Sequence, residues 1–153
     1  MKREENIKQQ LIEKFSYLEG KINIQRPRRL YADVSLANFE EVFAYASKEM
    51  NFSHLLTITG LDEQDNIGII YHLAQKEILL NIKTSVPKNN PNLKSIIGYF
   101  PGAEIYEREL VDLLGVKVEG LPEGYRYPLT DEWPKDQFPL RKDWKPGSQK
   151  AGC

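Results

Sequence analysis

Cysteine is almost absent from this 153-residue chain, which carries Cys153 alone. One thiol cannot form an internal disulfide, and an iron–sulfur cluster requires several cysteine ligands, so we expect the chain to hold no cluster by itself. Its two histidines, His54 and His72, lie on expected strands with no cysteine near them in the sequence. The spacings typical of zinc sites are therefore missing, and we interpret both as ordinary strand residues and expect no metal site.

Long hydrophobic runs and an excess of one charge are also absent. No apolar stretch approaches the roughly 18 residues that a membrane span requires, and the charged N-terminus lacks the apolar segment of a signal peptide. The chain has 21 basic and 22 acidic residues, so its net charge is −1. No overall field then attracts nucleic acid or an anionic membrane. We expect a cytosolic protein, or one that is bound to a membrane only through partners.

Motifs of common enzyme classes are missing as well. Gly115, Gly120 and Gly124 have the wrong spacing for a phosphate-binding loop and follow a helix rather than a strand. The sequence contains no serine nucleophile elbow and no cysteine–histidine pair. It therefore predicts no catalytic residue and no cofactor-binding residue in this chain.

Hydrophobic periodicity predicts an α+β domain over residues 1–119. Apolar residues at helical spacing predict helices at 4–19, 35–50, 92–100 and 102–114, while alternation predicts strands at 28–34, 54–61, 67–73 and 78–84. Short loops between the last three strands favour antiparallel neighbours. We therefore expect a mainly antiparallel four-stranded sheet with helices packed on one face, with Ser35 capping the second helix and Gly115 ending the last one.

Residues 120–153 have a different character, because prolines recur there among tryptophan, tyrosine and phenylalanine without any regular period. Proline-dense segments are extended and do not form central strands, yet disordered tails contain few aromatic residues. We predict an extended, Pro/aromatic-rich C-terminal arm that docks its rings against another surface.

Charged residues are dense on the helix expected at 102–114, which carries Glu104, Glu107, Arg108, Glu109 and Asp112. Glu104 and Asp112 each lie four residues from Arg108, so one interpretation is a solvated face with ion pairs worth about 0.2–0.5 kcal/mol each. A second is a pair of carboxylates for acid–base catalysis. A third is a charged face that is buried against a basic partner.

The arm offers a second cluster between Pro139 and Trp144. Leucine and tryptophan side chains fill pockets, and arginine makes forked pairs with carboxylates, so the cluster is typical of an interface hot spot. An aromatic and basic strip also stacks on single-stranded nucleic acid. Acidic residues such as Asp131, Glu132 and Asp136 in the same stretch would repel phosphates, so we expect no nucleic acid partner.

The block from Glu107 to Val116 together with the run from Pro139 to Trp144 resembles the 30 kDa subunit family of respiratory complex I. This family includes the related subunit of membrane-bound, energy-converting hydrogenases. Gly120, Pro122, Arg126 and Trp133 also match, and the resemblance covers about residues 28–144. The chain departs from the family pattern at Leu121, where histidine is usual, and at Lys135, where glycine is usual. Its compact length favours the hydrogenase-like or archaeal dehydrogenase branches.

This resemblance implies a non-catalytic scaffold subunit in the hydrophilic arm of a membrane-bound, ion-translocating oxidoreductase, which we expect to be an energy-converting hydrogenase. It implies that the chain docks on the large catalytic subunit beside iron–sulfur subunits, at the cytoplasmic face of the cell membrane and peripherally, so that the membrane is reached only through partner subunits. It also implies that iron–sulfur clusters and a nickel–iron site, or flavin and quinone, lie on those partners. The residues expected at the partner interface are Glu107, Arg108, Glu109, Asp112, Arg126, Trp133, Pro139, Leu140, Arg141, Lys142, Asp143 and Trp144.

Two alternatives stay open. One is the 30 kDa-type subunit of an NADH–quinone dehydrogenase (NADH dehydrogenase type) or of an archaeal dehydrogenase that oxidises a reduced cofactor. The other is a free-standing small enzyme that uses the carboxylates of Glu107, Glu109 and Asp112.

Overall fold

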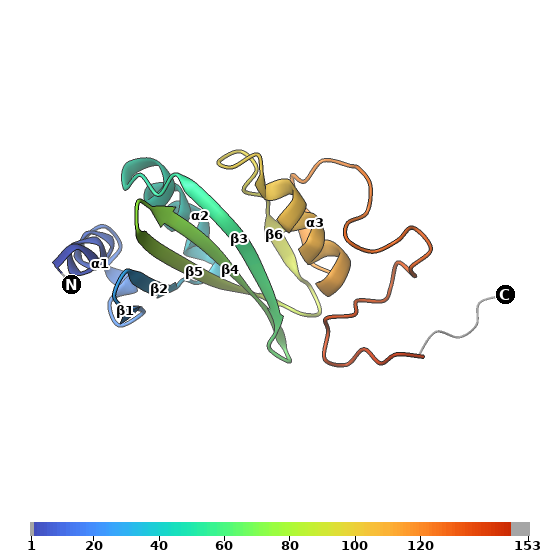
Figure 1. Ribbon diagram of the computed structural model, residues 1–153. Coiled ribbons are helices and arrows are strands. Elements are labelled where there is room, and N and C mark those ends of the chain that lie inside the picture. The colour runs from blue at the N-terminus through green and yellow to red at the C-terminus, as the bar shows by residue number, and fades with distance from the viewer. Residues whose placement is uncertain (1, 148–153) are drawn as a thin grey trace. The chain divides into compact units, whose positions relative to one another are not determined.

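The computed structural model describes residues 2–147, which form an α+β fold (Figure 1). These residues divide into two compact units. The first unit contains the residues up to 59 together with 69–85, and the second contains 60–68 together with the residues from 86 onward. The segment after residue 120 belongs to the same unit as the helix before it, and the domain boundary expected at residue 119 stays a prediction.

Five strands form one sheet in the order β1-β2-β5-β4-β3. The strands are β1 (Ile22–Arg26), β2 (Arg29–Asp33), β3 (His54–Asp62), β4 (Asn66–Gln75) and β5 (Ile78–Pro87). β1 pairs with β2 in antiparallel fashion, whereas β2 runs parallel to β5 with Leu30 opposite Leu80. The sheet is therefore mixed and five-stranded, and the predicted four-stranded, mainly antiparallel sheet is wrong. The chain between β2 and β5 contains a helix and two strands, long enough for a parallel pairing.

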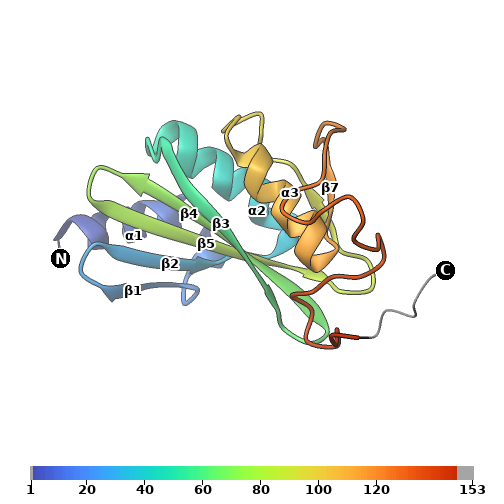
Figure 2. The same ribbon diagram turned by 45° about the vertical axis from the view of Figure 1, so that its right-hand side comes forward.

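Helix α1 (Lys2–Lys14) buries Ile7 and Leu11, and a 3₁₀ turn (Ser16–Leu18) follows it. The predicted helix at 4–19 thus begins earlier and loses its regular form before Gly20, whose φ of +77° permits the turn into β1. Figure 2 shows α1 and α2 on the same face of the sheet, as expected.

Helix α2 (Leu36–Ala44) continues into a π-helical turn (Tyr45–Glu49). The helix and the turn together cover most of the predicted helix. The rings of Phe39 and Phe43 lie 4.7 and 5.4 Å from the ring of Tyr71 on β4, so an aromatic cluster fixes the helix to the sheet. Ser35 occupies the N-cap position but makes no side-chain hydrogen bond there, so the expected cap does not form.

A chain of polar contacts crosses the sheet at His72. The imidazole Nε2 lies 2.8 Å from Thr59 Oγ1, its Nδ1 lies 2.7 Å from Asn81 Oδ1, and the Asn81 amide donates to the Leu30 carbonyl. Both ring nitrogens are therefore satisfied within the sheet. His54 and His72 lie on β3 and β4 as predicted.

In the second unit, α3 (Ala103–Leu114) connects two short parallel strands, β6 (Asn92–Lys94) and β7 (Lys117–Glu119). The predicted helix at 92–100 is wrong, because the backbone at 92–94 pairs instead with residues 117–119, which lie beyond α3. Helix α3 is confirmed, and Gly115 ends it in the left-handed conformation with φ +73°. The Gly115 N–H donates to the carbonyls of Leu110 and Val111, which closes the last turn.

Gly60 on β3 meets α3 at a close approach. A Cβ atom at this position would lie 2.4 Å from Leu114 Cδ1 and 2.5 Å from Leu110 Cδ2. No side chain fits there, so the absence of a side chain at residue 60 lets the helix pack on the backbone of the strand.

Residues 121–147 contain neither helix nor strand and form the described part of the C-terminal arm. The remaining part of the predicted arm, residues 148–153, lies outside the described residues. None of the helices within residues 2–147 has the length and apolar character needed to cross a membrane.

Candidate partner interface

Asp62 at the end of β3 is a point where three segments of the second unit meet. Its carboxylate accepts hydrogen bonds from Lys88 Nζ at 2.7 Å, from the backbone N–H of Lys142 at 2.8 Å and from the backbone N–H of Gln64 at 2.8 Å. Its side chain is 1% exposed, whereas that of Asp143, which also pairs with Lys88, is 72% exposed. The arm is therefore fastened to β3 through a buried carboxylate.

The protonation of Asp62 reflects two opposing effects. Burial disfavours the charged form, but the hydrogen bonds from Lys88, Lys142 and Gln64 outweigh it and lower the pKa of Asp62 to about 2. The carboxylate is thus charged at neutral pH, and it holds its donors as a charged acceptor.

Asp112 on α3 fastens the arm a second time. Its Oδ1 accepts from Arg126 Nε at 2.9 Å and pairs with Nη2 at 2.8 Å, while its Oδ2 accepts from the Leu129 N–H at 2.7 Å. Arg126 also donates to the Trp133 carbonyl. The expected i, i+4 pair between Asp112 and Arg108 is replaced by this contact, whereas the pair of Arg108 with Glu104 forms at 2.8 Å.

The C-terminal end of α3 is covered by the arm. The Leu140 N–H donates to the Leu113 carbonyl at 3.0 Å, and Arg141 Nε donates to the Leu114 carbonyl at 2.7 Å. These carbonyls have no partner inside the helix, and a cation there is favoured by the helix dipole. Arg141 also lies over the ring of Phe138, 4.7 Å from its centroid.

The two tryptophans of the arm contact each other. The rings of Trp133 and Trp144 lie 5.7 Å apart, and both indole N–H groups donate to Gln137, one to its carbonyl and one to its side-chain oxygen. The rings that the sequence led us to expect at a docking surface are thus partly used to fold the arm.

Glu107 is fully buried rather than at the surface. Its Oε2 accepts from Ser95 Oγ at 2.6 Å and its Oε1 accepts from the Ile96 N–H at 2.7 Å, which ties α3 to the segment after β6. Burial raises the pKa of Glu107, and the two hydrogen bonds oppose that rise. The interpretation of the α3 charges as a solvated face is wrong for Glu107 and for Asp112, which is 6% exposed.

The structure separates the predicted interface residues into three groups. The buried and half-buried residues whose side chains make polar contacts inside the chain are Glu107, Arg108, Asp112, Arg126, Trp133, Arg141 and Trp144. Leu140 is 53% exposed, and Lys142 and Asp143 are exposed as well. Glu109 and Pro139 are half-buried. The partner role of all these residues stays a prediction, and the exposed group is the better candidate for direct contact.

Sequence reasoning missed Asp62 and its contacts with Lys88 and Lys142, which lie 26 and 80 residues away from it. No local pattern signals such contacts. Glu107 did carry a signal, because it shares a helical stripe with the buried residues Ala103, Leu110 and Leu114.

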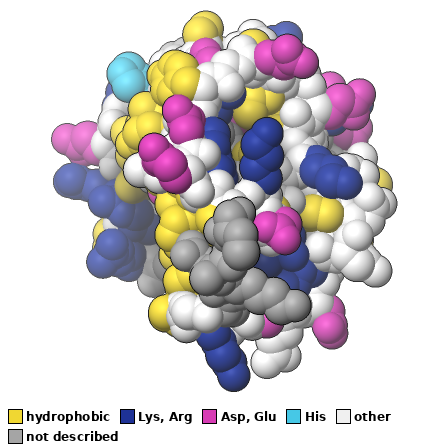
Figure 3. Space-filling model, turned by 90° about the vertical axis from the view of Figure 1, so that its right-hand side faces the viewer, with side chains coloured by type: hydrophobic (Ala, Val, Ile, Leu, Met, Phe, Trp, Pro, Cys, Tyr) yellow, Lys and Arg dark blue, Asp and Glu magenta, His cyan; other side chains and the backbone are white. Residues whose placement is uncertain are grey.

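One face of the molecule shows how charge is distributed (Figure 3). Lysine and arginine side chains lie among acidic and hydrophobic side chains on this face, and a group of them follows its left edge. Among residues 2–147, no three His, Cys, Asp or Glu side chains gather in a way that could hold a metal ion.

Comparison with known proteins identifies the family of this chain. The family model for the respiratory-chain NADH dehydrogenase 30 kDa subunit matches residues 32–150. The chain belongs to this family. The matched region contains both β3, with Asp62, and the whole contact surface between α3 and the arm.

Members of the 30 kDa subunit family from several complexes resemble the chain along most of its length. A subunit of the F420H2 dehydrogenase of Methanosarcina mazei is 29% identical over 86% of this chain and 85% of its own length. A subunit of the NADH-quinone oxidoreductase of Moorella thermoacetica is 30% identical over 92% and 95%. The membrane-bound hydrogenase subunit beta of Pyrococcus furiosus is 26% identical over 95% and 88%. Other members are longer, and the match spans 44% of an NADH-quinone oxidoreductase subunit from Chloroherpeton thalassium.

A solved structure of a family relative shares the fold. A chain of the membrane-bound sulfane sulfur reductase, an archaeal respiratory membrane complex, superposes with a TM-score of 0.81 at 29% identity, covering 94% of this chain and 86% of that chain. Relatives of the chain are thus subunits of complex I-like and other respiratory-type membrane complexes.

Proposed function

We propose that this chain is a non-catalytic scaffold subunit in the hydrophilic arm of a membrane-bound, ion-translocating oxidoreductase, where it docks on the large catalytic subunit. The observation that carries this proposal is the family membership, because the similarity extends over most of the chain to subunits of a dehydrogenase, of a membrane-bound hydrogenase and of a respiratory membrane complex. Iron–sulfur clusters and the catalytic centre are then expected on neighbouring subunits, and the membrane is reached only through them.

The buried carboxylates of the second unit support a structural role for this chain. Asp62, Glu107 and Asp112 are each 6% exposed or less, and both oxygens of Glu107 and of Asp112 are occupied by donors from the chain itself. A carboxylate used in acid–base catalysis must reach the proton of a substrate. This geometry does not favour the alternative of a free-standing enzyme that uses Glu107 and Asp112.

The arm supports docking because its inner side is fastened to α3 while apolar side chains remain outside. Leu140 is 53% exposed and Tyr125 is 74% exposed, although both lie within a segment held by several hydrogen bonds. Exposed apolar and aromatic side chains on a preorganised backbone are suited to binding a partner with a low entropy cost.

The test is purification of the native complex through an affinity tag on this chain, comparing Leu140→Asp with Leu56→Asp. Leu56 on β3 is 46% exposed and provides a control of matched residue type and exposure in the other unit. We expect Leu140→Asp to lose the large subunit and Leu56→Asp to retain it. Recovery of the large subunit with both variants in full yield would contradict docking through the arm.

Two kinds of complex remain in competition within this proposal. Similarity to the membrane-bound hydrogenase subunit beta supports the energy-converting hydrogenase type. Similarity to two dehydrogenase subunits supports a complex that oxidises a reduced cofactor. The purified complex decides between them: hydrogen evolution from a reduced dye supports the first, and oxidation of F420H2 or NADH without it supports the second.

A further inference from the structure

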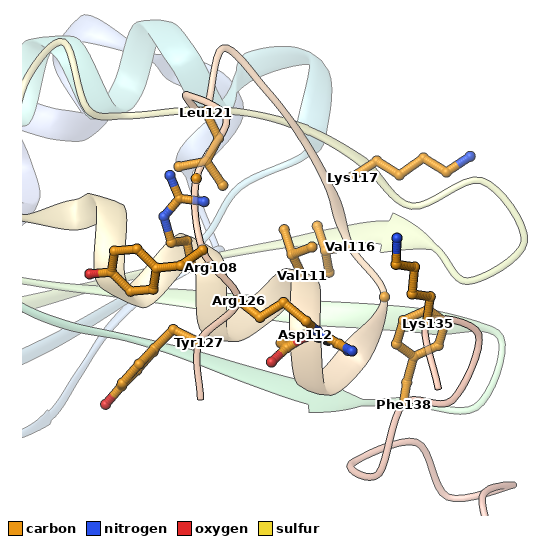
Figure 4. A pocket seen from close by; sticks show the side chains of 13 residues that line it. Arg108, Val111, Asp112, Val116, Lys117, Leu121, Arg126, Tyr127, Lys135 and Phe138 are labelled. Atoms are coloured by element: carbon orange, nitrogen blue, oxygen red, sulfur yellow. Dashed lines mark hydrogen bonds and ion pairs between the residues drawn. The ribbon is translucent and has the colours of Figure 1, made fainter. Parts of the chain in front are cut away.

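A pocket of about 360 Å³ lies between α3 and the arm, wholly within the second unit (Figure 4). Arg108, Val111 and Asp112 of α3 form one wall, and the loop at residues 121–127 forms the opposite wall. Residues 115–117, Lys135 and Phe138 complete the lining. The volume lies at the low end of the range for ligand pockets, about 300–1,000 Å³, and is sufficient for one or two side chains.

The walls of the pocket are held by contacts that do not depend on an occupant. Arg108 Nη2 donates to the Pro122 carbonyl at 2.7 Å, and the Arg126–Asp112 pair closes the base of the loop. A Cβ atom at Gly124 would lie 2.7 Å from Arg108 Nη2, so the loop approaches the arginine closely. The ring of Tyr125 lies 5.8 Å from the Arg108 guanidinium. The pocket is therefore preformed, which lowers the cost of binding.

The charge of the pocket differs from that of the chain. Four basic side chains and one carboxylate line it, for a net charge of +3, although the whole chain carries −1. Arg126 is neutralised by Asp112, and Arg108 is paired with Glu104. Lys117 and Lys135 are both exposed, and within residues 2–147 neither of them forms an ion pair or a side-chain hydrogen bond. Figure 4 shows these two lysines at one end of the pocket and Arg108 at the other.

The rest of the lining is apolar and aromatic. Val111, Val116, Leu121 and Phe138 provide apolar surface, and Tyr125 is 74% exposed. The complementary ligand therefore carries a negative charge at the lysine end and an apolar group deeper in the pocket. Two unpaired cations beside apolar surface match an acidic side chain that follows or precedes an apolar one in a peptide.

We propose that this pocket receives a peptide segment of a partner subunit. In that segment an Asp or Glu pairs with Lys117 and Lys135. An adjoining apolar or aromatic side chain fills the space between Val111, Leu121 and Phe138. The inference rests on the proposed function, because it names the chemistry of the partner that the arm binds. Peptide is favoured over a small anion because the wall is made by the same arm that exposes Tyr125 and Leu140.

Carbodiimide cross-linking of the tagged native complex tests the pairing directly, since this reagent joins a lysine amine to a carboxylate as an amide with loss of water. We expect mass spectrometry to find Lys117 or Lys135 joined to an Asp or Glu of a partner subunit beside an apolar residue. Lys117→Arg/Lys135→Arg should keep the complex but lose this cross-link, because arginine preserves the charge and does not react.

Charge reversal tests the energetic contribution. Lys117→Glu/Lys135→Glu should weaken partner retention about tenfold or more, whereas Lys2→Glu/Lys21→Glu, with the same change in net charge at exposed positions of the first unit, should not. Unchanged retention, or cross-links from these lysines only to this chain, overturns the inference while the complex itself still purifies. If the unmodified tagged chain brings down no other subunit, the proposed function fails instead.

Discussion

Replacing Asp62 with asparagine should release the arm from β3. The aspartate accepts three hydrogen bonds with a side chain that is 1% exposed, and one donor is the charged Lys88. The amide group of asparagine retains one acceptor oxygen and places an N–H₂ donor against other donors. Removing one member of a buried ion pair costs about 3–5 kcal/mol. The cost is smaller here because Lys88 is 17% exposed and keeps its ion pair with Asp143. We therefore expect Asp62→Asn to lower the free energy of unfolding by about 2–3 kcal/mol.

The same reasoning predicts a dependence on pH. The pKa of Asp62 is about 2 in the folded protein against an ordinary value of 3.8, so the carboxylate contributes about 2 kcal/mol at neutral pH. A group whose pKa is lowered by folding stabilises above its unfolded pKa, and the contribution is lost as the pH falls from about 4 toward 2. The difference in stability between the wild-type protein and Asp62→Asn should therefore shrink over that interval.

Tryptophan fluorescence measures the effect selectively, because Trp133 and Trp144 both lie in the arm and in contact with each other. In urea titrations at several pH values, we expect Asp62→Asn to shift the fluorescence transition to lower urea, and trypsin to cleave faster at Arg141 and Lys142. Asp143→Asn removes an exposed partner of the same Lys88, so it should cost at most about 1 kcal/mol. Equal stability of the wild-type and Asp62→Asn proteins at pH 7, or a difference that persists unchanged at pH 2, would refute the reasoning.

Two further substitutions test other contacts of the second unit. Gly115→Ala should destabilise the chain by about 1–2 kcal/mol, because φ at this residue is +73° and the added Cβ would lie 2.7 Å from Arg141 Nη2. Thermal unfolding measures this loss of stability. An unchanged melting temperature would contradict the role of Gly115 as the left-handed cap of α3. Glu107→Gln should flatten the pH dependence of the free energy of unfolding. Burial raises the pKa of Glu107, so the wild-type protein loses stability as the pH rises above 4.5, the ordinary pKa of a glutamate. Urea titrations between pH 4 and 8 should show the wild-type protein losing stability relative to the variant, and parallel curves would contradict this prediction.

Local signals in the sequence predicted the elements that depend on local structure. Helix α3 and its glycine cap were found because apolar spacing and Gly115 lie within a few residues of each other. The long strands β4 and β5 were recognised as well, because β5 alternates along its length and β4 buries Ile67, Ile69, Tyr71 and Leu73 at every second position. Family membership was predicted from the block at Glu107 and the run from Pro139 onward, and the match of the family model confirms it.

Elements that depend on distant partners were missed. β1 has a single buried residue, Ile22, so its alternation is too short to detect, and the parallel pairing of β2 with β5 has no signal in either strand. The segment at 92–94 becomes a strand because residues 117–119 pair with it. Pairing between residues far apart in the chain is set by the fold as a whole, which short-range periodicity does not encode.

The partner of a charged side chain was also beyond the local pattern. The i, i+4 spacing on α3 described Glu104 and Arg108 correctly but assigned Asp112 to the wrong arginine. Its partner Arg126 is 14 residues away, on the arm. The sequence indicated that the arm binds a surface, and the structure shows that α3 of the same chain is the first surface it binds.

The contact of Asp62 with Lys142 has a consequence for synthesis. Every residue of the first unit has left the ribosome once residue 85 has emerged. The hydrogen bond from the backbone N–H of Lys142 to Asp62 forms later, because Lys142 follows Asp62 by 80 positions. During that interval the hairpin end at residues 60–68 lacks its last hydrogen-bond donor. We expect a nascent chain to acquire the first unit early and to present a finished docking surface only after residue 142 has emerged, which delays assembly until the arm has been synthesised.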